Sequence, residues 1–113
     1  MSDFVWEPTS EYIERANVTR LMRKHGIDDY HQLVERSQDD IEWFWQAAID
    51  DLGIEFSKPF KQLLDATRGL QWPRWFTGGQ INLTHNCVDR HATSPLATQA
   101  ALVWEGEDGD SRT

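Results

Sequence analysis

The feature of this sequence that most restricts its fold is a large number of aromatic side chains on a short, acidic chain. Six Trp, five Phe and two Tyr occur in 113 residues, and the formal net charge is −8. Two clusters, EWFWQ at 42–46 and QWPRWF at 71–76, hold much of this aromatic surface. Aromatic side chains dominate cores and interfaces, and a chain of this size has little interior in which to bury them. We therefore expect some of these rings to face a partner surface.

Length, charge and cysteine content exclude several classes of protein. The chain is long enough for one domain and too short for two. An excess of 19 acidic over 11 basic residues disfavours nucleic acid and anionic membranes as partners, because both attract clustered Lys and Arg. The single cysteine, Cys87, cannot form an internal disulfide. No signal peptide and no membrane-spanning apolar run is visible, so we expect a cytoplasmic protein with no nucleic-acid or membrane partner.

Helical signals fill the first part of the chain. A long first helix is expected from Ser10 to the basic stretch RKHG at 23–26, where Gly26 supplies the residue that ends the helix. His25, in that last turn, is expected to be an ordinary surface residue. A short second helix is expected over 30–36.

The third helix, expected over 41–52, has the clearest pattern. Ser37 and Asp40 form an approximate capping box before it, apolar residues recur within it at steps of three and four, and Gly53 ends it. Trp43 lies outside the apolar stripe, which indicates a second contact surface.

The pattern changes after this helix. The expected elements are strands at 54–56 and 60–64, an irregular loop at 71–81, a helix at 82–91, a strand at 99–105 and a terminal turn. Pro73 makes the loop irregular, and Asn82 is the expected N-cap of the helix. The last strand would be an edge without neighbours, able to pair with another chain. The fold class is therefore α+β and mainly helical, with a helical N-terminal cap, an aromatic-rich loop, one further helix and short strands.

The stretch NLTHNCVDRH at 82–91 is rich in side chains that bind metals or take part in catalysis. In an extended strand His85, Cys87, Asp89 and His91 would share one face. Neighbouring members would then lie about 7 Å apart, too far for all four to ligate one ion. We therefore expect a helix and no metal site.

As a helix, the same stretch has two faces. The polar arc holds Asn82, His85, Asn86, Asp89 and Arg90, and the mostly apolar arc holds Leu83, Cys87, Val88 and His91. We expect the apolar arc to be buried and the stretch to be structural. Two alternatives stay open: Cys87 and His91, four residues apart, could form a nucleophile and its base, or the stretch could contact a substrate.

Two other stretches resemble ligand-binding loops. Gly78 and Gly79 precede a helix, where an anion can bind, but no Lys followed by Ser or Thr accompanies them. A tight turn that delivers Trp75 and Phe76 into packing is favoured over a phosphate site. The acidic stretch at 105–110 lacks the spacing of a calcium loop, so a solvated turn is expected.

Several of these stretches, in this order, resemble the N-terminal region of AMP-forming acyl-CoA synthetases of the acetyl-CoA synthetase type. They are FW at 44–45, WFTGG at 75–79, NLTHNCVDRH at 82–91 and AALVWEGEDGDSRT at 100–113. The resemblance covers roughly residues 10–113, and the string at 82–91 is its most specific part.

The resemblance implies a ligase that converts a carboxylate, ATP and CoA into acyl-CoA, AMP and pyrophosphate. Its cofactors, ATP, Mg²⁺ and CoA, belong to the parent enzyme. A phosphate loop ending in Lys-Gly, an acidic adenylate-site motif and a C-terminal lysine perform the family's chemistry, and none occurs in these 113 residues. No catalytic residue and no cofactor are therefore assigned to this chain. The residues that match family motifs are expected to be structural: Phe44, Trp45, Trp75, Phe76, Gly78, Gly79, Asn82, Asn86, Cys87, Asp89, Arg90 and His91.

The resemblance also divides the chain. Residues 1–98 correspond to the N-terminal helical region, and 99–113 to the first strand and turn of the AMP-binding domain. We expect a piece of a larger α/β enzyme, inactive alone, that contacts the remainder of the synthetase, another protein or a second copy through its aromatic surface. The alternative is a stand-alone interaction module that docks through the same aromatic face.

Overall fold

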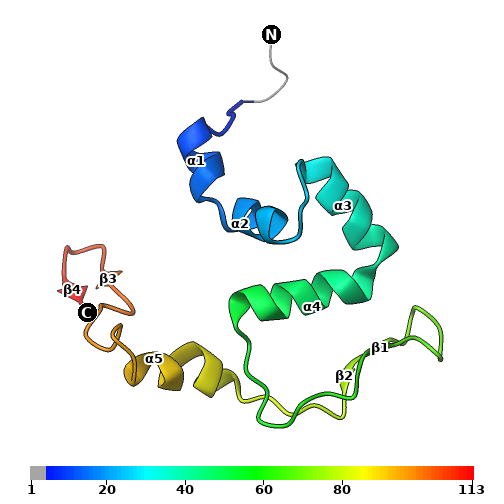
Figure 1. Ribbon diagram of the computed structural model, residues 1–113. Helices are drawn as coiled ribbons and strands as arrows, with labels where there is room; N and C mark the ends of the chain where they lie inside the picture. Colours follow the sequence, from blue (N-terminus) through cyan, green and yellow to red (C-terminus); the bar gives the residue numbers. More distant parts are fainter. Residues whose placement is uncertain (1–4) are drawn as a thin grey trace.

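The computed structural model describes residues 5–113 and shows an α+β, mainly helical chain, as predicted (Figure 1). Its helices are α1 (Ser10–Arg15), α2 (Asn17–Lys24), α3 (Tyr30–Asp39), α4 (Ile41–Leu52), the π-helix η1 (His85–Asp89) and α5 (Arg90–Ala92). Its strands are β1 (Gln62–Asp65), β2 (Arg74–Thr77), β3 (Trp104–Glu105) and β4 (Ser111–Arg112). Within residues 5–113, no helix is long and apolar enough to cross a membrane.

The first predicted helix is in fact two helices, α1 and α2. Ala16 between them is extended, with φ −68° and ψ 138°. The residues after it, from Asn17 to Thr19, have low helix propensity, and the Thr19 hydroxyl donates to the carbonyl of Ile13 across the break. The predicted end is confirmed: Gly26 has φ +63°, and the backbone N–H of the next residue donates to the Met22 carbonyl at 2.9 Å.

The junction of α3 and α4 corrects the predicted cap. Ser37 lies inside α3, where its hydroxyl donates to the carbonyl of Val34 at 2.7 Å. Asp40 instead separates the helices and caps α4, accepting from the N–H of Trp43 at 3.0 Å. An aspartate directly before the apolar stretch can cap it without help from a residue three positions earlier. Gly53 ends α4 in the left-handed conformation, as predicted.

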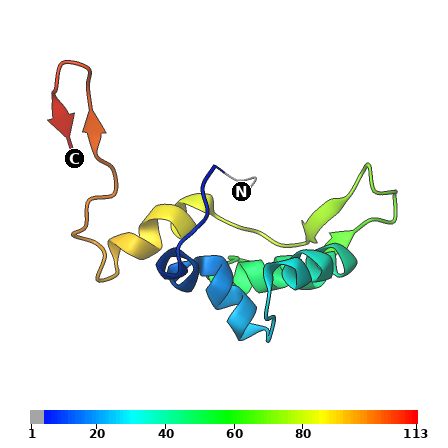
Figure 2. The ribbon, with the colours of Figure 1, turned by 90° about the horizontal axis from the view of Figure 1, so that it is seen from above.

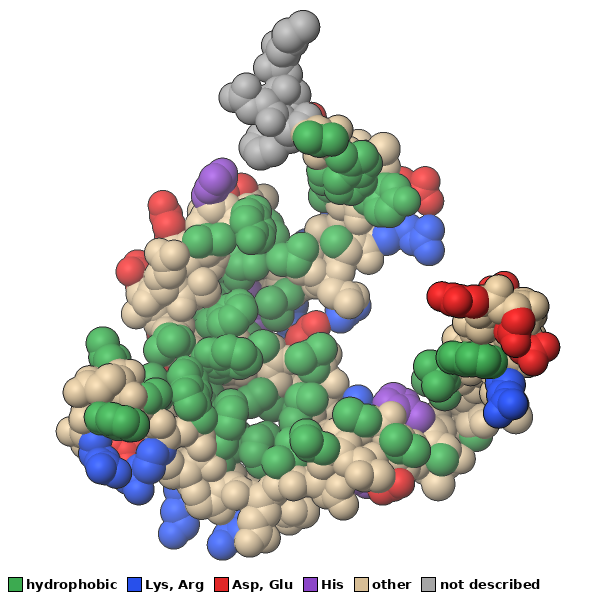
Figure 3. Space-filling model, turned by 180° about the vertical axis from the view of Figure 1, so that it is seen from behind, with side chains coloured by type: hydrophobic (Ala, Val, Ile, Leu, Met, Phe, Trp, Pro, Cys, Tyr) green, Lys and Arg blue, Asp and Glu red, His purple; other side chains and the backbone are tan. Residues whose placement is uncertain are grey.

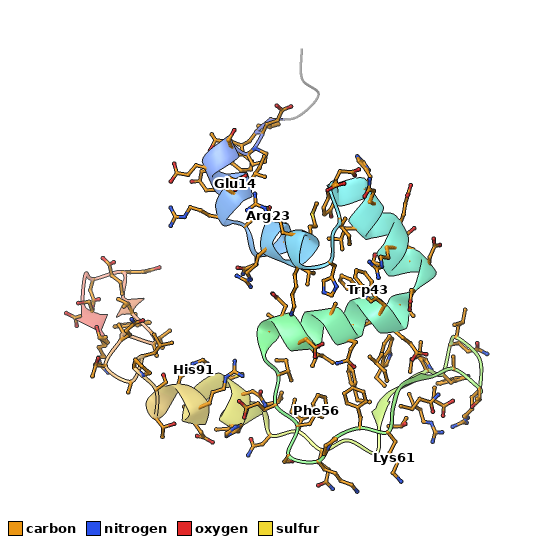
Figure 4. The ribbon with its side chains drawn as sticks, in the orientation of Figure 1. Glu14, Arg23, Trp43, Phe56, Lys61 and His91 are labelled. Atoms are coloured by element: carbon orange, nitrogen blue, oxygen red, sulfur yellow. The ribbon has the colours of Figure 1, made fainter. Side chains whose placement is uncertain are left out.

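Trp43 is half-buried and has a second contact surface, as its place in the sequence indicated (Figure 4). The Arg36 guanidinium of α3 lies 3.7 Å from the centre of the Trp43 ring, and His25, at the end of α2, meets the ring edge to face at 5.2 Å. His25 is therefore a half-buried packing residue, and its prediction as an ordinary surface residue is wrong. Arg20 adds a tie from α2 to α4, because it donates twice to the Asp51 carboxylate, at 2.9 and 3.3 Å.

The hairpin β1–β2 corrects two further predictions. Residues 54–56 form no strand, and the supposedly irregular loop contains β2, which pairs with β1 in antiparallel register. Asp65 is the reason this register is specific. Its carboxylate accepts from the Thr67 hydroxyl at 2.7 Å and pairs with the guanidinium of Arg74, the residue opposite it. The Thr67 hydrogen bond, followed by that from Arg74, lowers the pKa of Asp65 to about 2.

The predicted C-terminal strand is also shorter than expected. Only Trp104–Glu105 is extended, and it pairs with Ser111–Arg112, so β3 finds a neighbour in its own chain. The acidic turn between them is closed by a bond from the Gly106 N–H to the Asp110 carbonyl at 2.8 Å.

The elements lie in a single curved layer, and the β3–β4 hairpin projects away from the others (Figure 2). The Cα radius of gyration is 19.1 Å, whereas a compact domain of this length has about 13 Å. The small core consists of Leu21, Ile27, Leu33, Ala47 and Leu63. Many large apolar side chains, among them Trp45 and Leu52, therefore stay exposed.

Candidate functional site

The stretch at 82–91 begins as a capped helix, as predicted. The Asn82 side chain accepts from the backbone N–H of His85 at 3.3 Å. The π-helix η1 follows, and the short helix α5 continues it. π-turns are uncommon and occur mostly as single turns inside α-helices.

Asn86 is the side chain aimed inward by this helix. It is 6% exposed, and its amide oxygen accepts from the N–H of Glu55 at 2.8 Å. Its amide nitrogen donates to the Glu55 carbonyl at 2.9 Å and to the Asn82 carbonyl at 3.0 Å. One buried side chain thus satisfies both backbone groups of a residue in the irregular segment after α4.

Two further polar side chains of the same helix strengthen this attachment. His85 Nε2 lies 2.8 Å from the Glu55 carboxylate, and this hydrogen bond holds the pKa of Glu55 below its ordinary value. Arg90 donates to the carbonyls of Gly53 and Leu52, at the C-terminal end of α4. A cation there also interacts favourably with the helix dipole. We call the contacts of Asn86, His85 and Arg90 with 52–55 the polar clip.

The polar clip reverses the predicted orientation of the helix. Leu83 and Val88, expected to be buried, are 70% and 55% exposed, and Cys87 is exposed beside them. Three members of the polar arc, His85, Asn86 and Arg90, face the chain because they make hydrogen bonds with 52–55 that apolar side chains cannot make. The other two members, Asn82 and Asp89, are exposed. Sequence periodicity found the two arcs but could not show which one faces inward.

The structure brings the chemically reactive side chains to no common centre. In the part of the chain that the structure describes, no His, Cys, Asp and Glu cluster is arranged to hold a metal ion. His91 Nε2 lies 3.5 Å from Arg90 Nε, and no hydrogen bond joins His91 to Cys87 within residues 5–113. The nucleophile-and-base alternative therefore has no geometric support.

The WFTGG stretch packs as the sequence predicted. Trp75 meets Trp45 edge to face at 5.8 Å, and Phe76 joins a cluster with Phe56 and Phe60, with ring centres 5.2–5.6 Å apart. A Cβ on Gly79 would lie 3.0 Å from the Cβ of Phe60, so the cluster leaves no room for a side chain there.

An apolar concave surface runs along α4. One hollow of about 350 Å³ lies between α2, α3 and α4, and a second of about 510 Å³ lies between α4 and β2. Ala48 and Leu52 line both, so the two hollows lie next to each other. Figure 3 shows hydrophobic side chains gathered over this middle region. We call this surface the α4 groove.

Comparison with known proteins relates this chain to one family. The family model described as "Acetyl-coenzyme A synthetase N-terminus" matches residues 30–87. The acetyl-coenzyme A synthetase of Thiobacillus denitrificans is 33% identical over 109 residues, which are 96% of this chain and 15% of that protein. The acetyl-coenzyme A synthetases of Burkholderia mallei and Burkholderia pseudomallei are each 32% identical over 99 residues, 88% of this chain and 15% of theirs. The chain thus spans about one seventh of the length of these relatives.

Proposed function

Because the chain belongs to the family of acetyl-coenzyme A synthetase N-termini, we propose that it is the N-terminal structural part of an AMP-forming acyl-CoA synthetase. The parent reaction joins a carboxylate to CoA with cleavage of ATP to AMP and pyrophosphate. In this proposal the chain performs none of these steps and binds none of the three substrates. It forms a scaffold on which the rest of the synthetase packs.

The observation that carries this proposal is the surface left uncovered. The accessible surface is 9,657 Å², whereas a compact monomer of 13.2 kDa exposes about 6,400 Å². The excess of about 3,000 Å² on this chain alone is larger than the roughly 1,000–2,500 Å² that each partner buries at a large permanent protein interface. A surface of this size is expected on one piece of a larger body.

The α4 groove is the part of this surface best suited to a permanent partner. It is concave, lined mainly by aliphatic and aromatic side chains, and includes two neighbouring hollows. In the proposal its occupant is the remaining polypeptide of the same synthetase, because the matched relatives are roughly six times as long as this chain. ATP, Mg²⁺ and CoA are assigned to that remaining part.

Acetate-dependent exchange of pyrophosphate into ATP tests the catalytic half of the proposal. The 113-residue chain should show none, and the full-length synthetase should show it. Exchange by the pure 113-residue chain would contradict the proposal. The alternative is a stand-alone interaction module. It would be favoured if the 113-residue chain formed a stable complex with an unrelated protein and not with the remainder of the synthetase.

Leu52→Asp tests the scaffold half, because Leu52 lines both hollows of the α4 groove. In the full-length synthetase this carboxylate would be buried without a partner, and we expect a loss of about 3 kcal/mol or more in the free energy of unfolding. Gln32→Asp places the same group at an exposed site in the first turn of α3, where an acidic residue is tolerated, and should change stability by less than about 0.5 kcal/mol. Equal effects of the two variants would show that the groove is open to solvent.

A further inference from the structure

The apolar arc of the helix at 82–91 forms an exposed surface that is separate from the α4 groove. Leu83, Cys87 and Val88 are exposed on it, four and five residues apart, as expected for neighbours on one side of a helix that widens into a π-turn. This outward face is apolar, although an exposed helix normally turns its polar side to water.

The polar clip fixes this orientation. A rotation of the helix that buried Leu83 and Val88 would withdraw Asn86 from both backbone groups of Glu55. It would also break the pairing of His85 with Glu55 and of Arg90 with the end of α4. The two bonds between Asn86 and Glu55 are part-buried, and losing such a hydrogen bond costs about 0.5–1.5 kcal/mol. The polar clip therefore favours the orientation in which the apolar arc faces outward.

We infer that Leu83, Cys87 and Val88 form a second docking surface, covered by an apolar segment of the same synthetase polypeptide that lies outside these 113 residues. This inference rests on the proposed function and adds the place at which the body of the enzyme attaches. The length of polypeptide outside the chain supports this occupant, since the matched relatives have 85% of their sequence beyond the matched part.

The position of the surface also favours this occupant. The segment 95–103 that follows α5 is exposed throughout and leads to the projecting β3–β4 hairpin (Figures 1 and 2). Leu102 and Val103, just before β3, are exposed apolar residues as well. The outward face of the helix and the hairpin therefore lie at the same end of the curved layer, so one body can cover both.

Cys87 reports directly on this surface, because it is the chain's single thiol. The experiment is alkylation of the native full-length synthetase, with the modified peptide quantified by mass spectrometry against the same protein unfolded in urea. We expect labelling of Cys87 to be slowed at least about 100-fold in the native enzyme. Labelling within about threefold of the unfolded rate would overturn the inference.

Dilution distinguishes the possible occupants. If the protection of Cys87 is unchanged when the enzyme is diluted about 1,000-fold, the face is covered from within one polypeptide. Protection that is lost on dilution would assign the face to a second copy and overturn the inference.

Val88→Asp provides an independent test of the same face. It should raise the labelling rate of Cys87 at least about tenfold, whereas Gln32→Asp should leave it unchanged. If Cys87 is labelled freely but Leu52→Asp still destabilises the enzyme, this docking surface is refuted and the proposed function stands. Free labelling together with no effect of Leu52→Asp would refute both.

Discussion

The side-chain amide of Asn86 pairs with both backbone groups of Glu55, as an adjacent β-strand would. The two residues are 31 positions apart, and the whole β1–β2 hairpin lies between them. This pairing gives the irregular segment after α4 a partner without forming a sheet, and it turns the apolar arc of the next helix outward.

Asn86→Ala should therefore loosen the segment after α4. The Glu55 N–H would lose its acceptor, and the expected cost is about 1–3 kcal/mol. We expect hydrogen exchange at the Glu55 amide to accelerate at least about tenfold. Asn17→Ala removes an exposed amide that accepts from Arg20 and serves as the control. Unchanged exchange at Glu55 in the Asn86 variant would show that the polar clip contributes no stability.

Asp65 should titrate far below an ordinary aspartate. Its pKa in the folded chain is about 2, below the ordinary value of 3.8, mainly because the Thr67 hydroxyl donates to it. The ionised carboxylate therefore stabilises the hairpin above pH 3.8, and this contribution is lost as the pH falls toward 2. Carboxyl NMR titration measures the pKa directly. Thr67→Val should raise it, and an Asp65 that titrates normally would contradict the hairpin geometry.

Trp43→Leu should destabilise the junction of α2, α3 and α4. The variant loses the stacked guanidinium of Arg36 and the edge contact of His25, and we expect a loss of about 1–3 kcal/mol. Trp43→Phe keeps an aromatic face and should lose less. Trp72→Leu is a matched control, because Trp72 is exposed. Thermal unfolding of the 113-residue chain, followed by circular dichroism, should rank the variants in that order.

Gly79→Ala should disturb the aromatic cluster. The new Cβ would lie 3.0 Å from Phe60 and 3.2 Å from Phe56, closer than ordinary packing distances. Overpacking of this kind costs about 1–3 kcal/mol. Near-ultraviolet circular dichroism should show altered aromatic signals, and an unchanged spectrum with unchanged stability would indicate that the cluster is loosely packed.

The elements that sequence predicted well are those specified by neighbouring residues. Gly26 and Gly53 end their helices where expected, and both occupy conformations that glycine favours. The pattern at 41–52 likewise predicted α4. Each of these signals lies within the helix it specifies or directly beside it.

The features that sequence missed depend on distant partners. Ala16 was expected inside a helix, yet its neighbours break the helix there. β2 pairs with β1 and places Arg74 opposite Asp65, nine residues earlier, and no residue next to Arg74 indicates that pairing. The orientation of the helix at 82–91 was predicted wrongly because the backbone groups of Glu55 determine it. Periodicity identifies the faces of a helix, whereas a distant partner selects which face is inward.

The separation between Glu55 and Asn86 also sets an order of assembly. Closing this loop of about 30 residues has an entropic cost that falls when the intervening chain is already compact. The β1–β2 hairpin, with the contacts of Phe76 to Phe56 and Phe60, brings 55 and 86 together, and hairpins form within microseconds. The α3–α4 pair and the hairpin should therefore form first, and the helix carrying Asn86 should attach last. On a ribosome, this attachment would occur only after Arg90 has left the exit tunnel.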